Sequence, residues 1–455
     1  MSTALYKAQP ASRLSATDAF FVAYQQHSGI LMQLGGEIEL DGELGREDLE
    51  EMISYVVGRW PRLGQALHKG LLGLKWKGDC LTANMLRVGS SSNVLSEWRN
   101  EPIDPFREPP FQVLWVKNGT SNTVAFRAHH AVMDGESFVA VTADAAYFLM
   151  QARIGRKAPP SEPAPTTTLN DLISVRQLIR RGRISSMWRY TRSLAAEARA
   201  GRSVRLAMDS CTAGNIRTCE RRLEKDAFIR LKERGAALRV APIWLCAAAW
   251  MRAIHRWNVS RGSSANALVS LEFPVSLRRS RNGDSKNGHD VLGNFISPLV
   301  LFGDATQPLD QLARGLRKQL MQGIRSQSHL GTPLLTAPGK FLPWALFRRV
   351  AVNPTTTGFA TSHFTWFEQP DVYADIARSS EGAMRLTGQR IYTPVCLHMG
   401  AAAAVLASPD YAQLFLTYRV TALSNEAAAI LLDLMVQELE DNKPGAEELV
   451  NRATC

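Results

Sequence analysis

The chain contains 455 residues, enough for two domains, and its 45% hydrophobic and 21% charged residues are typical of a globular protein. The longest uncharged apolar run, residues 240–251, is too short to cross a bilayer, and residues 1–10 lack the apolar core of a secretory signal. None of the six cysteines forms a CxxC pair. This indicates a protein of a reducing compartment, in which the cysteines act as small hydrophobic residues. We therefore expect a cytoplasmic protein without a transmembrane segment.

The net charge of +11 raises the question of anionic partners. Residues 176–205 contain nine arginines and one acid, Glu197. Two interpretations remain open for this segment. It is either a solvated basic helix face or a docking site for the phosphates of a cofactor or for an acidic carrier protein. Nucleic acid is not expected, because no zinc spacing, RNA-binding aromatic signature or basic-zipper pattern accompanies the arginines.

In the first part of the chain, a strand is expected at residues 37–40 and a helix after it that ends near Pro61. The apolar residues of this helix recur at helical spacing: Leu49, Ile53, Val56 and Val57. Residues 122–130 alternate with the period of a strand, and residues 135–153 change to the helical period. The pattern predicts a strand-to-helix corner between them, with Asp134 as a candidate N-cap.

Four prolines in residues 158–168 indicate a domain boundary, so we divide the chain into residues 1–157, 158–214 and 215–455. The last segment mixes helical and strand patterns as the first does, which favours two α/β sandwiches. It is expected to contain two helices within 226–257, strands within 267–279 and 413–423, and a closing helix capped near Ser424. Strand 413–423 should direct one face inward, with Leu414, Leu416, Tyr418 and Val420 on it. His363 and His398 fall in strand-like runs and are expected to lie in the core or its wall.

The corner carries two adjacent histidines, His129 and His130, followed by Asp134 and Gly135. A histidine at a strand end is most often a structural residue. A rigid strand end can also direct an imidazole, which accepts and returns a proton near neutral pH, toward a cleft. No GxSxG, Walker A or HExxH motif is present, so a serine hydrolase, a nucleotide triphosphatase and a metal site are not expected.

Residues 129–135, HHAVMDG, resemble the HHxxxDG signature of the acyltransferase superfamily built on the chloramphenicol acetyltransferase fold. Condensation domains of peptide synthetases, wax ester synthases and polyketide-associated acyltransferases belong to it. Four further features resemble the family in the expected order: residues 58–67, 102–116, 273–279 with 292–295, and 414–432. The DFGWG motif of plant alcohol acyltransferases is absent, and GFATSHFTWF at 358–367 stands where some relatives have a Ser-Asn-containing strand.

The resemblance implies two chloramphenicol acetyltransferase-like subdomains, arranged as a pseudo-dimer with a tunnel between them. His130 matches the catalytic base and His129 its neighbour, whereas Asp134 is expected to pair with Arg278 of the second half. Gly135 should leave space beside the acyl carbonyl. Two further residues are candidate polar groups near the tunnel, each of them more often structural than catalytic: Asn294 and Ser362.

The resemblance also implies the reaction. An acyl group moves from a thioester of coenzyme A or of phosphopantetheine on an acyl carrier protein directly to an alcohol or amine of a small-molecule acceptor, with no bound cofactor. We expect a monomer acting in natural-product biosynthesis. The alternative is a wax ester synthase or diacylglycerol acyltransferase. A non-catalytic binding relative is the third possibility, and the intact HHxxxDG pattern argues against it.

Overall fold

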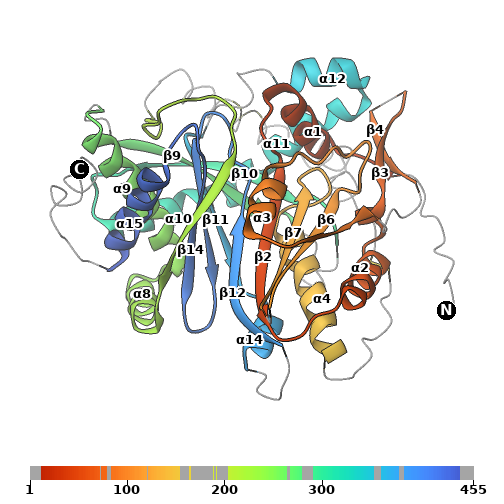
Figure 1. Cartoon of the computed structure of the whole chain (residues 1–455). Helices are drawn as coiled ribbons and strands as arrows, with labels where there is room; N and C mark the ends of the chain where they lie inside the picture. The colour runs from red at the N-terminus through yellow and green to blue at the C-terminus, as the bar shows by residue number, and fades with distance from the viewer. Residues whose placement is uncertain are drawn as a thin grey trace.

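The computed structural model describes residues 12–71, 73–78, 84–119, 121–153, 163–164, 188, 191, 203–263, 267–278, 291–352, 360–378 and 384–440. Within these ranges the chain forms three sheets covered by helices (Figure 1). Most of the proline-rich segment 158–168 and of the arginine-rich segment 176–205 lies outside the described residues, and so do the predictions made for them.

A five-stranded sheet lies at the centre of the first half, in the order β12-β2-β7-β6-β5. Its neighbours pair antiparallel except β5 and β6, which are parallel. Its strands are β2 (Gln33–Asp41), β5 (Leu86–Gly89), β6 (Phe111–Asn118), β7 (Ser121–His129) and β12 (Arg385–Tyr392). The helices of this half are α1 (Ala16–Ser28), α2 (Arg46–Arg59), α3 (Ser92–Asn100) and α4 (Gly135–Arg153).

A small sheet in the order β1-β4-β3 lies beside the five-stranded one. Its strands are β1 (Ser12–Arg13), β3 (Ala66–Lys69) and β4 (Leu74–Lys77), and the 3-10 helix η1 (Pro61–Gly64) precedes β3. Pro61 begins η1, so the preceding helix ends at Arg59, two residues before it. This confirms the expected helix end, because proline cannot donate the backbone hydrogen bond that the helix would need next.

The second half is organised around a six-stranded mixed sheet in the order β10-β9-β11-β13-β14-β8. Its strands are β8 (Ile216–Leu223), β9 (Leu268–Ser276), β10 (Ile296–Asp304), β11 (Ser362–Glu368), β13 (Ala401–Ala407) and β14 (Ala412–Arg419). The long helices are α8 (Lys225–Leu238), α9 (Pro242–Ser260), α10 (Leu309–Arg325) and α15 (Asn425–Glu440). Shorter ones are η4 (Ser328–Leu330), α11 (Gly331–Thr336), η5 (Ala337–Phe341), α12 (Trp344–Ala351) and α14 (Asp371–Arg378).

Helix α9 forms the centre of the second hydrophobic core. Its residues Cys246 and Trp250 are fully buried, and it packs against α10 and α15. Among the described residues no single helix is long and apolar enough to cross a membrane; α8 and α9 reach that composition only together and are bent by 103° at their junction. The two predicted helices within 226–257 are thus confirmed as core and surface helices of the same half.

Strand β12 connects the two halves. Although its residues come late in the chain, it pairs with β2 of the first sheet, and Tyr392 lies opposite Gly35. A Cβ on Gly35 would lie 1.8 Å from the Tyr392 ring, so only glycine admits this ring. Arg390 of β12 pairs with Glu39 at 2.5 Å and with Glu220 of the second sheet at 3.4 Å. Backbone pairing and charge therefore hold the two halves together.

Three expectations need correction. The strand expected at 37–40 begins at Gln33, since β7 pairs along its whole length. Val420 lies beyond the end of β14 and is exposed, and β14 is buried on both faces because Phe415 packs into a second apolar cluster with Ile391 of β12. His398 lies in a turn, not in a strand.

Candidate functional site

The histidine pair stands at the end of β7, where the chain turns toward α4. The backbone N–H of His129 donates to the Pro110 carbonyl at 2.8 Å, and that of His130 donates to the Met32 carbonyl at 2.7 Å. The residues directly before β6 and β2 thus hold the backbone at this point. The corner expected from the sequence is therefore rigid, and a side chain attached to it has a fixed direction.

Asp134 is fully buried and closes this corner. Its Oδ1 accepts the backbone N–H of Ser137 at 2.9 Å, which is the expected N-cap of α4. Its two oxygens also accept both terminal nitrogens of Arg278, each at 2.8 Å, and Oδ2 accepts the backbone N–H of Phe295 at 2.8 Å. The expected pairing of Asp134 with Arg278 is therefore present, in the bidentate form. Burial alone would raise the pKa of Asp134, but the charge and hydrogen bonds of Arg278 outweigh it and hold the pKa below its ordinary value.

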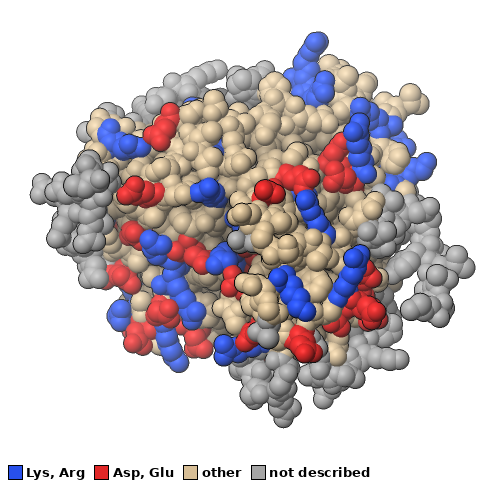
Figure 2. All heavy atoms as spheres, viewed as in Figure 1, with Lys and Arg blue, Asp and Glu red and all other residues tan. Residues whose placement is uncertain are grey.

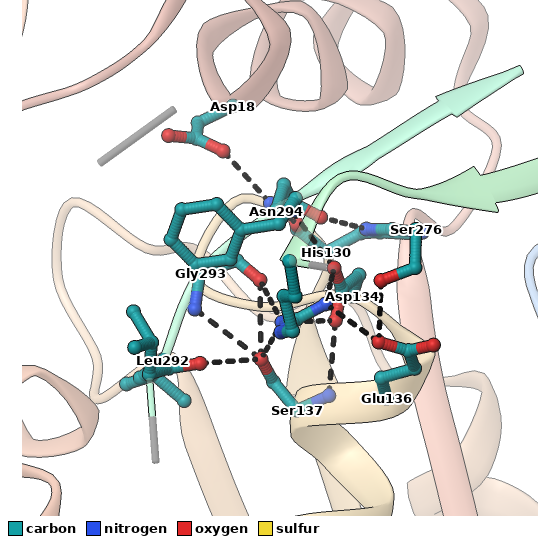
Figure 3. A network of polar contacts seen from close by, with 12 residues as sticks. Asp18, His130, Asp134, Glu136, Ser137, Ser276, Leu292, Gly293 and Asn294 are labelled. Carbon is teal, nitrogen blue, oxygen red and sulfur yellow. Dashed lines mark hydrogen bonds and ion pairs between the residues drawn. The ribbon is translucent and has the colours of Figure 1, made fainter. Parts of the chain in front are cut away.

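Arg278 joins the corner to the second half of the chain. Besides Asp134, its guanidinium donates to the Ser137 hydroxyl at 2.6 Å, the Gly293 carbonyl at 3.1 Å and Glu136 at 3.1 Å. Figure 3 shows the same cluster, in which Ser276 of β9 also donates to Glu136 at 2.8 Å. These contacts fix residues 293–295 next to the histidine corner.

Asn294, in that fixed segment, reaches His130. Its side-chain nitrogen donates to the His130 carbonyl at 2.6 Å and to Oδ1 of Asp18 at 2.8 Å (Figure 3). Both acceptors require the amide nitrogen on this side, which assigns the amide oxygen to the position 3.0 Å from Nδ1 of His130. An amide oxygen can only accept, so Nδ1 carries the proton and Nε2 keeps a free lone pair. Asn294 therefore sets the tautomer that a general base needs.

The environment also keeps His130 neutral. Burial lowers its pKa below the ordinary value, and the nearby Asp134 charge and the Asn294 hydrogen bond only partly oppose this. The ring of Phe21 on α1 stacks on the imidazole with 3.9 Å between centroids and an interplanar angle of 14°. A neutral, stacked and hydrogen-bonded imidazole is held in one orientation near pH 7.

Asp18, on α1, was not predicted as a site residue. It forms a capping box with Ser15, in which each side chain accepts the other's backbone N–H at 3.1 Å. Burial raises the pKa of Asp18 to about 6, despite its hydrogen bonds. The S-x-x-D spacing of residues 15–18 was a readable sign of a helix start, but nothing local in the sequence indicated the contact with Asn294.

His129 differs sharply from its neighbour. It is fully buried, and its Nδ1 accepts the backbone N–H of Ala131 at 3.1 Å, so the ring proton resides on Nε2. Burial, with a smaller contribution from His130, lowers the pKa of His129 to about 3. No described residue pairs with its Nε2. His129 is thus locked in a neutral form whose lone pair already serves the backbone.

Two further predicted site residues, Gly135 and Ser362, have contacts that join the sheets and strands. A Cβ on Gly135 would lie 2.6 Å from the Phe367 ring of β11, so glycine is needed here for the approach of the second sheet. Its predicted role beside an acyl carbonyl stays a prediction. Ser362, at the start of β11, donates to the Ser270 carbonyl of β9 at 2.9 Å and joins these two strands.

A second acid and base pair faces the first half of the chain from β9 and β11. Glu272 and His363 are directly opposed in the register, with 3.9 Å between Oε1 and Nδ1. Burial raises the pKa of Glu272 to about 7. Burial and, to a lesser degree, the neighbouring His130 lower the pKa of His363 to about 4. Their side chains are nevertheless 33% and 20% exposed, so solvent reaches both. No other polar partner of Glu272 is found among the described residues.

Among the described residues, no group of three or more His, Cys, Asp or Glu could hold a metal ion. The described cysteines are free; Cys246 is buried as expected, whereas Cys211 is exposed. The site thus consists of one neutral base, an asparagine and a carboxylate that orient it, and a buried ion pair that fixes the asparagine's segment.

No family model and no curated protein matches the chain. Several solved structures do match the chain. The condensation domain of the monacolin K polyketide synthase MokA is 12% identical, with 96% of this chain and 98% of that chain covered and a TM-score of 0.67. The starter condensation domain of rhizomide synthetase, solved with C8-CoA, is 13% identical over 95% and 97%, also at 0.67. SgcC5 from Streptomyces globisporus is 15% identical over 94% and 98%, at 0.64.

These likenesses extend over nearly the whole chain and establish the fold. The protein has the two-subdomain, chloramphenicol acetyltransferase-like architecture of condensation domains, as the HHxxxDG resemblance implied. At such low identity the likeness carries the fold and not the reaction.

The buried pair gives a first prediction. Asp134→Ala leaves buried Arg278 with only the partly exposed Glu136 as counter-charge, so we expect a loss of about 3–5 kcal/mol in the free energy of unfolding. In urea denaturation, the double variant Asp134→Ala/Arg278→Leu should lose less than the sum of the two single variants, because no uncompensated charge remains. Glu136→Gln, which removes only the partly exposed partner, serves as the control. Strictly additive losses would show that the two charges do not depend on each other.

Asn294 gives a second prediction. In Asn294→Ala both His130 tautomers become accessible, so kcat of a reaction that uses His130 as general base should fall by at least about tenfold while KM stays unchanged. The acid limb of the rate profile, expected below pH 6.5 in the parent, should move to lower pH, because the lost hydrogen bond had raised the pKa of His130. Asn258→Ala, another buried asparagine, should lower stability and leave the limb in place. An unchanged limb in Asn294→Ala would contradict the positioning role.

Proposed function

We propose that the chain transfers an acyl group directly from a thioester, carried by coenzyme A or by the phosphopantetheine of a carrier protein, to a small-molecule acceptor. The observation that carries this proposal is the free Nε2 of His130, opposite the nitrogen that Asn294 holds. The rhizomide synthetase domain solved with C8-CoA and Leu-SNAC supports a thioester donor by similarity of fold. No bound cofactor is needed, since the thioester supplies the activated acyl group.

The proposed reaction proceeds in two proton transfers. Nε2 of His130 takes the proton of the acceptor as its nucleophilic atom bonds to the thioester carbonyl carbon. The tetrahedral intermediate then breaks its carbon–sulfur bond, and the imidazolium returns the proton to the leaving thiolate. General base help of this kind contributes about 10²–10⁴ in rate. Holding donor and acceptor together supplies up to about 7–11 kcal/mol, so positioning is the larger effect.

Glu272 favours an amine over an alcohol as acceptor. Among the described residues Glu272 has no Lys or Arg partner, and its side chain is 33% exposed, so an ammonium group of the acceptor can reach it and supply the opposite charge. The raised pKa of Glu272 suits it to take one proton from the ammonium, which leaves the free amine for attack. His130 then takes the second proton, so the products are an amide, a thiol and one released proton. The proposed function is thus that of an amide-forming condensation enzyme of natural-product biosynthesis.

Two other functions make different demands. A wax ester synthase or diacylglycerol acyltransferase would use long-chain acyl-CoA with a fatty alcohol or diacylglycerol. These neutral acceptors carry no charge that could pair with the carboxylate of Glu272. A non-catalytic binding relative would not need the His130 tautomer that Asn294 selects. The carboxylate of Glu272 and the His130 tautomer therefore support a catalytic, amine-directed site.

For the reaction itself, His130→Ala should lower turnover at least about 100-fold while the melting temperature stays near that of the parent. His129→Ala removes a buried ring that holds the Ala131 backbone, so its main effect should be on stability. The measurement is thiol release from octanoyl-CoA in the presence of an amine acceptor, with product mass determined. Parent-like turnover in a folded His130→Ala variant would rule out the base.

For the acceptor, Glu272→Gln should raise KM for amines at least about tenfold and leave KM for the matched alcohols unchanged. Suitable pairs are primary amines and primary alcohols of equal chain length, from butyl to decyl, with octanoyl-CoA as donor. Glu233→Gln, an exposed carboxylate on α8, is the control. Robust ester formation from palmitoyl-CoA and a fatty alcohol, with no response to Glu272→Gln, would favour the wax ester synthase alternative.

A further inference from the structure

One corner of the first half exposes large apolar side chains to solvent. We call it the basic corner; it comprises the β3–β4 hairpin, Leu71 at the hairpin tip, and residues 338–352 with α12. Four of its apolar residues are strongly exposed: Leu71 by 95%, Phe341 by 54%, Leu346 by 46% and Val350 by 54%. Single exposed apolar residues are ordinary, but four on adjoining segments indicate an interaction surface.

The two segments of the basic corner lie against each other. A Cβ on Gly73, next to the hairpin tip, would lie 3.1 Å from the carbonyl oxygen of Lys340. The ring of Phe106 connects the segments further, with Trp344 of α12 at 6.5 Å between centroids and the ammonium of Lys69 of β3 at 5.5 Å. In Figure 1, α12 and the strands β3 and β4 lie together at one edge of the molecule. Leu71 and the exposed residues of α12 therefore belong to one surface.

Helix α12 has two apolar faces, of which one is buried and the other is exposed to solvent. Trp344 and Phe347 are buried and stack on each other, and the helix packs with them against α1. Leu346 and Val350, four residues apart, share another face and remain in solvent. Folding thus requires only one of these faces. The other apolar face serves no described contact within the chain.

The charge of the basic corner has one sign. Neither residues 61–78 nor residues 331–352 contain an Asp or Glu. Basic side chains surround the apolar ones: exposed Lys69, Lys77, Arg348 and Arg349, and half-exposed Lys75 and Lys340. Figure 2 shows Lys and Arg gathered at this corner, with acidic side chains directly beside them. A partner must therefore offer negative charge next to an apolar phase.

We propose that the basic corner docks on the surface of an anionic lipid bilayer, with Leu71, Phe341, Leu346 and Val350 entering the interface and the basic residues contacting the headgroups. Apolar residues ringed by Lys and Arg are the pattern of proteins that lie on membranes. The shape favours a bilayer over an acidic protein, because the apolar side chains stand on a hairpin tip and on the outer face of an edge helix. A soft interface accommodates such projecting groups without a complementary groove.

The test is co-sedimentation of the full chain with vesicles. Vesicles of phosphatidylglycerol and phosphatidylcholine, in about a 3:7 ratio, should bind the protein, pure phosphatidylcholine should not, and high ionic strength should weaken the binding. Each basic residue near an anionic surface is worth about fivefold in partitioning. Arg348→Gln/Arg349→Gln should therefore lower the partition coefficient about 25-fold, and Leu346→Ser/Val350→Ser should lower it at least tenfold, about the effect of 1.4 kcal/mol.

Matched controls come from the second half. Arg317→Gln/Lys318→Gln removes an adjacent exposed basic pair of α10, and Ile229→Ser/Val259→Ser removes two exposed aliphatic side chains. Both should bind vesicles as the parent does, and circular dichroism with thermal melting should show every variant folded. Loss of binding in the α12 variants alone supports the proposal.

Three outcomes would overturn the proposal: no binding to anionic vesicles, equal binding to pure phosphatidylcholine, or equal losses in the control variants. Binding of an acidic carrier protein that depends on Leu346 and Val350, without vesicle binding, would assign the surface to a protein partner instead. Acyl transfer to soluble acceptors should be unchanged in all four double variants, so the result is independent of the proposed reaction.

Discussion

The bidentate pair between Asp134 and Arg278 is the contact on which the site depends. Both side chains are buried, so each charge would be strongly unfavourable without the other. The pair joins the two halves of the chain, because Asp134 caps α4 in the first half and Arg278 follows β9 in the second. Once the pair forms, the Gly293 carbonyl and the Phe295 N–H are also engaged, and Asn294 between them can only lie beside His130. A buried ion pair between the two halves thus fixes the segment that carries Asn294, and Asn294 in turn orients the imidazole of His130.

The same low-dielectric interior affects the ionisable groups of the site in different ways. Burial lowers the pKa of His129 and His130 alike, yet only His130 keeps a lone pair free, because the backbone of Ala131 occupies that of His129. Burial raises the pKa of Glu272, which makes a carboxylate usable as a proton acceptor near neutral pH. Hydrogen-bond partners, rather than burial itself, therefore decide which group can do chemistry.

Fold and function rest on different observations in this protein. The architecture matches condensation domains over nearly the whole chain at 12–14% identity, which shows how little of the sequence the fold constrains. The exchanged strand β12 and the ion pair between the halves are the features that hold the two subdomains together. The proposed chemistry rests instead on a few atoms around His130, and the proposed membrane surface lies on a separate corner that the fold does not need.

The sequence by itself determined the elements and the corner. Helical spacing located α2 and α4, alternation located β7, and Pro61 and Asp134 marked a helix end and a helix start, because these signals act within a few residues. The HHxxxDG resemblance added the fold and the partner of Asp134. Tertiary structure alone decided the contacts of Asn294 with Asp18 and with His130, which join residues 276 and 164 positions apart. It also decided that β12 enters the first sheet and that Glu272 faces His363, since period-two patterns show which face is apolar but not which strand lies opposite.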